Sequence, residues 1–73
     1  MSTLKTGLLW FDGDPKKSTL QKVEEAVAYY RKKMQADPTV CYLHPSDIDK
    51  TAPGMVKPWR SILKNHIWIG CEL

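Results

Sequence analysis

Acidic, imidazole and lysine side chains follow two short apolar segments of this chain, where they could bind a cation or a phosphate. The apolar segments are residues 8–11 and 39–43, and a polar turn follows each of them. The candidate residues are Asp12, Asp14, Lys16 and Lys17 after the first segment, and His44, Ser46, Asp47 and Asp49 after the second. Carboxylates with an imidazole can hold a divalent cation, and lysines can hold a phosphate. The same residue types build tight turns and helix caps, which is the simpler explanation of the pattern.

A second group of residues combines bases with aromatic rings near the C-terminus. Positions 50–64 contain four bases and no acid, whereas the net charge of the whole chain is only +3. Lysine and arginine side chains bind phosphates, and aromatic rings stack on nucleobases. This composition therefore favours a surface that binds single-stranded nucleic acid or an acidic protein. The candidate residues are Lys57, Trp59, Arg60, Lys64, His66 and Trp68. The alternative is a solvated charged face over a small core that tryptophans fill.

Two cysteine-histidine pairs have spacings that resemble those of zinc ligands. They are Cys41 with His44, and His66 with Cys71. Residues three or five apart on a strand point to opposite faces, so both pairs would have to leave strand geometry to share one zinc ion. We therefore expect both cysteines to be small buried hydrophobic residues. The sequence predicts no metal, no cofactor and no catalytic residue.

The composition indicates a single domain, residues 1–73, in the cytoplasm. Hydrophobic residues make up 42% of the chain and charged residues 26%, which are ordinary values for a globular protein. Two cysteines are too few for a disulfide-rich secreted scaffold, so we expect reduced thiols. The apolar run 7–11 is too short for a signal-peptide core or a membrane-spanning helix, and no membrane association is expected.

The clearest predicted element is an amphipathic helix over residues 18–36. Ser18 followed by Gln21 fits a capping box at its start, and Pro38 disfavours helical geometry just beyond its end. One stripe of this helix would hold apolar residues at spacings of three and four positions. They are Leu20, Val23, Val27, Tyr30 and Met34.

Two predicted strands flank this helix. Segment 8–11 is apolar throughout, so we expect a strand buried on both faces, and segment 39–43 is rich in β-branched and aromatic residues. Short connections through a helix make such strands parallel, either adjacent or with room for a third strand between them. Segment 45–58 is expected to be mostly loop, with a helical turn opened by Ser46.

The last predicted strands are Arg60–Leu63 and His66–Leu73, joined as a C-terminal β-hairpin at Lys64 and Asn65. The fold class is therefore α+β with the order β-α-β-β-β: one amphipathic helix packed on one face of a small mixed sheet of three to four strands. A single helix covers only one face of the sheet. The other face must meet water, a ligand or a second copy, so a monomer and a homodimer both stay open.

Three stretches of the chain resemble a group of short prokaryotic proteins of uncharacterised function. They are residues 10–16 (WFDGDPK), 40–46 (VCYLHPS) and 65–70 (NHIWIG). Because they span nearly the whole chain, the resemblance implies a self-contained domain. It implies no activity, cofactor or catalytic residue.

These patterns together predict a small non-enzymatic binding or adaptor module, with nucleic acid or another acidic partner on its basic and aromatic C-terminal surface. Two alternatives remain open. One is a small metal- or phosphate-binding enzyme that uses Asp12, Asp14, His44 and Asp47. The other is an accessory or structural subunit of a larger complex, with no ligand of its own.

Overall fold

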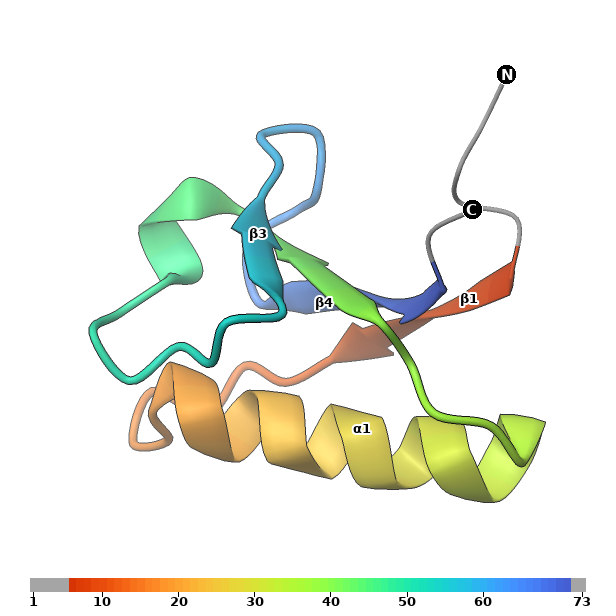
Figure 1. Ribbon diagram of the computed structural model, residues 1–73. Helices are drawn as coiled ribbons and strands as arrows, with labels where there is room; N and C mark the ends of the chain where they lie inside the picture. Colours follow the sequence, from red (N-terminus) through yellow and green to blue (C-terminus); the bar gives the residue numbers. More distant parts are fainter. Residues whose placement is uncertain (1–5, 72–73) are drawn as a thin grey trace.

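A computed structural model describes residues 6–71, in which a single α-helix packs under a four-stranded sheet (Figure 1). The elements are β1 (Thr6–Phe11), α1 (Thr19–Met34), β2 (Val40–Leu43), the 3₁₀ turn η1 (Pro45–Asp47), β3 (Val56–Pro58) and β4 (His66–Cys71). The predicted α+β class and the β-α-β-β-β order are confirmed.

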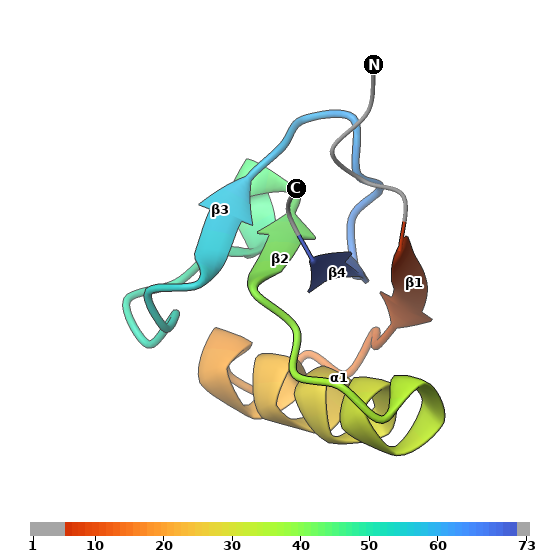
Figure 2. The ribbon, with the colours of Figure 1, turned by 45° about the vertical axis from the view of Figure 1, so that its right-hand side comes forward.

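The strand order in the sheet is β1-β4-β2-β3. Strand β4 runs antiparallel to both β1 and β2, while β3 runs parallel to β2. The two strands that flank the helix are therefore parallel to each other, with β4 between them. Both views show α1 on one side of the sheet only, which leaves the opposite face without a covering helix (Figures 1 and 2).

The predicted C-terminal β-hairpin is wrong. Residues 60–63 form turns, in which the Ile62 N–H donates to the Trp59 carbonyl at 3.1 Å and the His66 N–H to the Leu63 carbonyl at 3.2 Å. Strand β4 instead pairs with β1 on one side and with β2 on the other, where its apolar residues reach the core. Asn65 does adopt left-handed geometry, with a φ of 66°, but this residue leads into β4 from a loop.

The missing fourth strand comes from the segment that was expected to be mostly loop. Strand β3 is attached to β2 by the Cys41 N–H, which donates to the Met55 carbonyl at 3.0 Å, and by the Trp59 N–H, which donates to the Leu43 carbonyl at 2.8 Å. Pro58 has no N–H to donate, and it is tolerated because β3 is an edge strand.

Helix α1 begins and ends close to the predicted positions. Ser18 is the N-cap, and it forms the expected capping box with Gln21. The helix ends at Met34, and Gln35 then takes left-handed geometry with a φ of 53°. Three bases in the last turn, Arg31, Lys32 and Lys33, complement the helix dipole.

The buried stripe of α1 is rotated relative to the prediction. Val23 and Tyr30 are buried as expected, but Leu20 and Met34 are each 38% exposed. Thr19 and Ala26 complete the buried face instead. The sequence pattern did not show this rotation, because it was traced through large apolar side chains, whereas Thr19 carries a hydroxyl and Ala26 is small.

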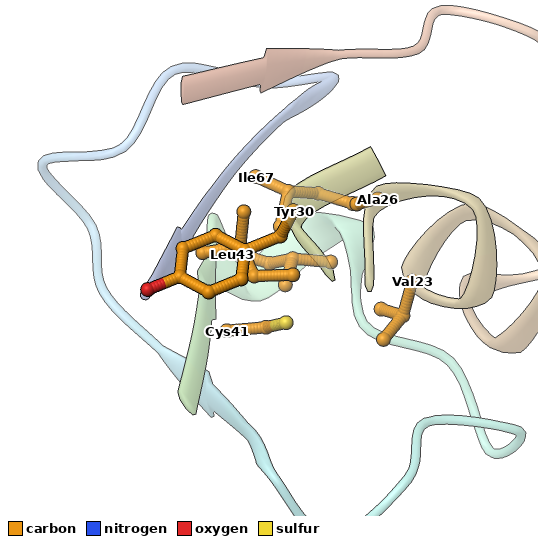
Figure 3. Close-up of a cluster of buried hydrophobic side chains, with 7 residues drawn as sticks. Val23, Ala26, Tyr30, Cys41, Leu43 and Ile67 are labelled. Atoms are coloured by element: carbon orange, nitrogen blue, oxygen red, sulfur yellow. The ribbon is translucent and has the colours of Figure 1, made fainter. Parts of the chain in front are cut away.

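The core lies between this helix face and the facing residues of the central strands (Figure 3). The buried residues of this cluster are Val23, Ala26, Tyr30, Cys41, Leu43, Ile67 and Ile69. The alternation predicted for the last strand is confirmed for Ile67 and Ile69, whereas Glu72 and Leu73 lie outside the described residues.

Strand β1 is not buried on both faces, which corrects the prediction for segment 8–11. It is an edge strand, with β4 as its only neighbour in the described sheet. Leu8 and Trp10 pack against the core, but Leu9 is 61% and Phe11 63% exposed. A continuous apolar run does not distinguish a central strand from an edge strand whose outer face is also apolar. No helix of the described chain is long and apolar enough to cross a membrane.

Candidate functional site

The carboxyl ends of β1 and β2 open at one edge of the sheet, close to the start of α1, as the parallel arrangement requires (Figure 1). The first turn at this edge is held by its own carboxylates. Asp12 accepts the N–H of Asp14 at 3.0 Å and the Lys17 ammonium at 3.1 Å, and these two contacts hold the pKa of Asp12 below its ordinary value. Asp14 in turn accepts the Lys16 N–H at 2.9 Å.

Lys17 forms ion pairs with two carboxylates at this edge. Its ammonium lies 2.9 Å from Glu25 and 3.1 Å from Asp12, and both contacts raise the pKa of Lys17. A phosphate would have to displace these carboxylates to use Lys17 as a ligand.

The second turn is tied to the helix through Thr19, the only polar residue of the described core. The Thr19 hydroxyl donates to the Asp47 carbonyl at 2.8 Å and accepts the Asp49 N–H at 3.0 Å. The Asp49 carboxylate accepts the Thr19 N–H at 3.0 Å. Hydrogen bonds from the Thr51 hydroxyl and from Thr19 lower the pKa of Asp49 to about 2.

The remaining candidates at this edge also have structural partners. The Nδ1 atom of His44 accepts the Ser46 N–H at 3.1 Å, which caps η1, and the Asp47 carboxylate accepts the Asn65 N–H at 2.6 Å. Among residues 6–71, no three His, Cys, Asp or Glu side chains are grouped so that they could hold a metal ion. The structure thus uses these groups as turn and cap residues.

Of the cysteine-histidine pairs, His66 and Cys71 lie at opposite ends of β4. Cys41 is fully buried, and burial raises the pKa of its thiol to about 12. The Cys71 thiol lies 3.5 Å from the Tyr30 hydroxyl and 3.6 Å from the Asp37 carbonyl. The Cys71 thiol thus contacts the helix and the loop that follows it.

The face of the sheet away from α1 carries a row of aromatic rings. Side chains alternate along a strand, so Tyr42 and Trp68 point away from the helix because Cys41, Leu43, Ile67 and Ile69 point toward it. Tyr42 and Trp68 are opposite each other in the register of β2 and β4, with ring centroids 6.0 Å apart. We call this side the open face, defined by Leu9, Phe11, Tyr42, Lys57, Trp59, His66 and Trp68.

Further rings lie on either side of this pair. Trp59, which directly follows β3, meets Tyr42 edge to face at 5.1 Å. On the other side, Phe11 lies 5.1 Å from the His66 ring across the β1–β4 pair. The Trp68 ring lies over Gly7, where a β-carbon would overlap its Cζ2, Cε2 and Cη2 atoms. Trp59, at 38%, and Phe11, at 63%, are the most exposed rings of the row.

The basic residues of the predicted binding surface lie on or beside these rings. Lys57 is exposed and is opposite Tyr42 in the β2–β3 register, so it lies on the open face. Arg60 and Lys64 are exposed in the loop between β3 and β4, which rises on the side of the sheet away from α1 (Figures 1 and 2). The Asp47 carboxylate of the second turn accepts the N–H of Asn65, which follows Lys64.

Sequence reasoning placed Trp59, His66 and Trp68 in one candidate surface but missed Tyr42 and Phe11. Tyr42 lies within the second strand, where its alternation with Cys41 and Leu43 was a usable signal. Phe11 gave no such signal, because it closes a run of four apolar residues. No family model, no curated protein and no solved structure matches this chain, so the resemblance to short prokaryotic proteins stays a prediction.

Proposed function

We propose that this protein is a non-enzymatic module that binds single-stranded nucleic acid on the open face of its sheet. The observation that carries the proposal is the row of rings Trp59, Tyr42 and Trp68, with neighbouring centroids 5.1 and 6.0 Å apart on a face that no described helix covers. Unpaired bases stack on such rings, and each stacked base contributes about 1–3 kcal/mol.

The charge around the rings supports an acidic ligand. Lys57 lies within the face, Arg60 and Lys64 lie in the adjoining loop, and positions 50–64 contain no acid. A nucleic-acid strand that crosses the rings would bring its phosphates close to these lysine and arginine side chains. The release of counterions would then add affinity that depends on salt. A duplex cannot offer the faces of its bases to these rings, so we expect a preference for single strands.

The same proposal places the protein in the cytoplasm. Both thiols are free, which suits a reducing compartment. The candidate edge of Asp12, Asp14, His44 and Asp47 supports the non-enzymatic form of the proposal, because its carboxylates and its imidazole are already engaged in turns and caps.

Fluorescence anisotropy with labelled oligonucleotides tests this function. We expect micromolar binding of a single strand at low salt, weaker binding at moderate salt, and weaker binding of the matching duplex. Replacing Trp59 by Ala should weaken single-strand binding about 5- to 150-fold, which corresponds to the loss of one stacked base. Tyr29→Ala is the matched control, because Tyr29 is similarly exposed, at 41%, but lies on the helix.

A second pair of variants tests the charge. Lys64→Gln should reduce the slope of log affinity against log salt by about one, whereas Lys32→Gln on the helix should leave it unchanged. The absence of salt-sensitive binding at micromolar protein would remove nucleic acid as the ligand. Equal effects of the open-face variants and their helix controls would remove the open face as the site.

A further inference from the structure

The two edges of the sheet differ in how well they are protected against pairing with another strand. Strand β3 has only three residues, which include an exposed lysine and a proline. Strand β1 has six residues, Thr6–Phe11, with neither a charge nor a proline among them. Natural sheets protect their edges with charges, prolines and short strands, and β1 has none of these devices.

The register shows which backbone groups of β1 face outward. The Asp12 N–H donates to the Asn65 carbonyl at 2.9 Å, and the same register joins every residue of β1 to β4. In an antiparallel pair, hydrogen-bonded positions alternate, so residues 8 and 10 bond to β4. The backbone N–H and C=O groups of Gly7, Leu9 and Phe11 therefore point away from the sheet.

Apolar side chains flank this free edge on both faces. Leu9 and Phe11 are 61% and 63% exposed on the open face. On the helix side, Trp10 packs on Tyr29 with centroids 5.0 Å apart, and Tyr29 is itself 41% exposed. The exposed large hydrophobic side chains of the strands are thus gathered where the backbone also lacks a strand partner in the described chain.

We propose that β1 pairs with β1 of a second copy of this chain, antiparallel and about a two-fold axis at Leu9. A strand whose outward groups belong to residues 7, 9 and 11 is complementary to itself in this register. Leu9 then faces the second copy's Leu9, and Gly7 faces its Phe11. Phe11 of one copy would lie beside Gly7 of the other copy and beside the Trp68 ring that covers this glycine. Leu9 and Phe11, the two exposed apolar side chains of β1, would both be removed from water.

The size of this contact sets the strength of the dimer. A six-residue strand is about 20 Å long, and with its flanking side chains it would bury roughly 600 Å² in total. This is well below the roughly 1,600 Å² of stable complexes, so we expect a dissociation constant on the order of 100 μM. The contact closes at two copies, because the other edge of each sheet ends in the protected β3.

The dimer would join two open faces into one sheet of eight strands. This consequence, unlike the dimer itself, rests on the proposed function: a single strand long enough to cross both faces would bind more tightly than one that crosses a single face.

Sedimentation equilibrium of the full chain from about 20 μM to 1 mM, without nucleic acid, tests the dimer separately from the function. We expect a concentration-dependent shift from monomer to dimer and no larger species. Leu9→Lys places two like charges opposite each other at the axis and should weaken the dimer about tenfold or more. Leu63→Lys is the matched control, because Leu63 is 69% exposed in the loop before β4 and should leave the dimer intact.

A mixture of variants tests the two-fold axis itself. At about 100 μM, Leu9→Lys and Leu9→Glu should each be largely monomeric, and their equimolar mixture should associate again, because lysine then faces glutamate. Circular dichroism checks that each variant is folded. If either variant is unfolded, amide exchange of the unmodified chain decides: the N–H groups of Leu9 and Phe11 should exchange more slowly as concentration rises, and those of Leu8 and Trp10 should not change.

A chain that stays monomeric to 1 mM would overturn the proposal. So would a dimer that Leu9→Lys and Leu63→Lys affect equally, or one whose formation leaves the exchange of Leu9 and Phe11 unchanged.

Discussion

Gly7 is the position where a single methyl group most directly tests the arrangement of the open face. A β-carbon there would overlap three atoms of the Trp68 indole, so the ring would have to swing away from β1. Overpacking of this kind costs about 1–3 kcal/mol. Alanine also lowers the conformational entropy of the unfolded chain, which offsets about 0.4–1 kcal/mol of this loss of stability. We therefore expect Gly7→Ala to lower the free energy of unfolding by about 1–2 kcal/mol.

Thermal unfolding followed by circular dichroism measures this effect. For a domain of this size, 1 kcal/mol corresponds to about 4–8 °C, so the Tm of Gly7→Ala should fall by about 5–15 °C. The near-ultraviolet spectrum should change as well, because the displaced Trp68 ring leaves its contact with Tyr42, whose centroid is 6.0 Å away.

Gly54→Ala is the matched control for this experiment. A β-carbon at Gly54 meets nothing within 4 Å, and no described glycine has a positive φ. The control should therefore be neutral or more stable by up to about 1 kcal/mol. If Gly7→Ala were as stable as Gly54→Ala and kept the spectrum of the unmodified chain, Trp68 would not lie over Gly7, and the row of rings would be wrong.

Two further predictions concern buried groups, the Thr19 hydroxyl and the Cys41 thiol. Thr19→Val should lower stability by about 2–3 kcal/mol in a denaturant titration, because the Asp49 N–H and the Asp47 carbonyl lose their partner at a residue that is 2% exposed. Thr51→Val, at an exposed position, should cost less than about 1 kcal/mol, and equal losses would contradict the assigned role of Thr19. Burial raises the pKa of Cys41 from 9.0 to about 12, so the unfolded chain loses this proton first and stability should fall as pH rises above 9, by about 1.4 kcal/mol at pH 10. Cys41→Ala should start less stable but show a smaller fall over the same range, and an unchanged fall would refute this role of the buried thiol.

The local signals in the sequence were sufficient for the main elements of the fold. Spacings of three and four residues with a Ser18–Gln21 capping box placed α1 within two residues at either end. The polar turns after segments 8–11 and 39–43 placed two parallel strands and one shared edge. These features depend on interactions within one segment, so the order of residues is enough to predict them.

The same local signals predicted part of the candidate surface. Trp59, His66 and Trp68 could be grouped because they are close in sequence and interleave with bases. Tyr42 and Phe11 join them only because β4 pairs with β2 on one side and with β1 on the other. Nothing in the sequence indicates that residues so far apart in the chain lie side by side in the sheet.

Tertiary structure alone decided which strand is central and which is an edge. The sequence determined that segments 8–11 and 66–71 are apolar strands, but not that β4 lies inside the sheet and β1 at its margin. Pairing energy depends on which strands meet across the whole chain, and a hairpin to residues 60–63 would have been the nearer choice. The core favoured the longer connection because it places Ile67 and Ile69 against α1. This choice also leaves the rings on the face away from α1 and makes β1 an edge strand of the described sheet.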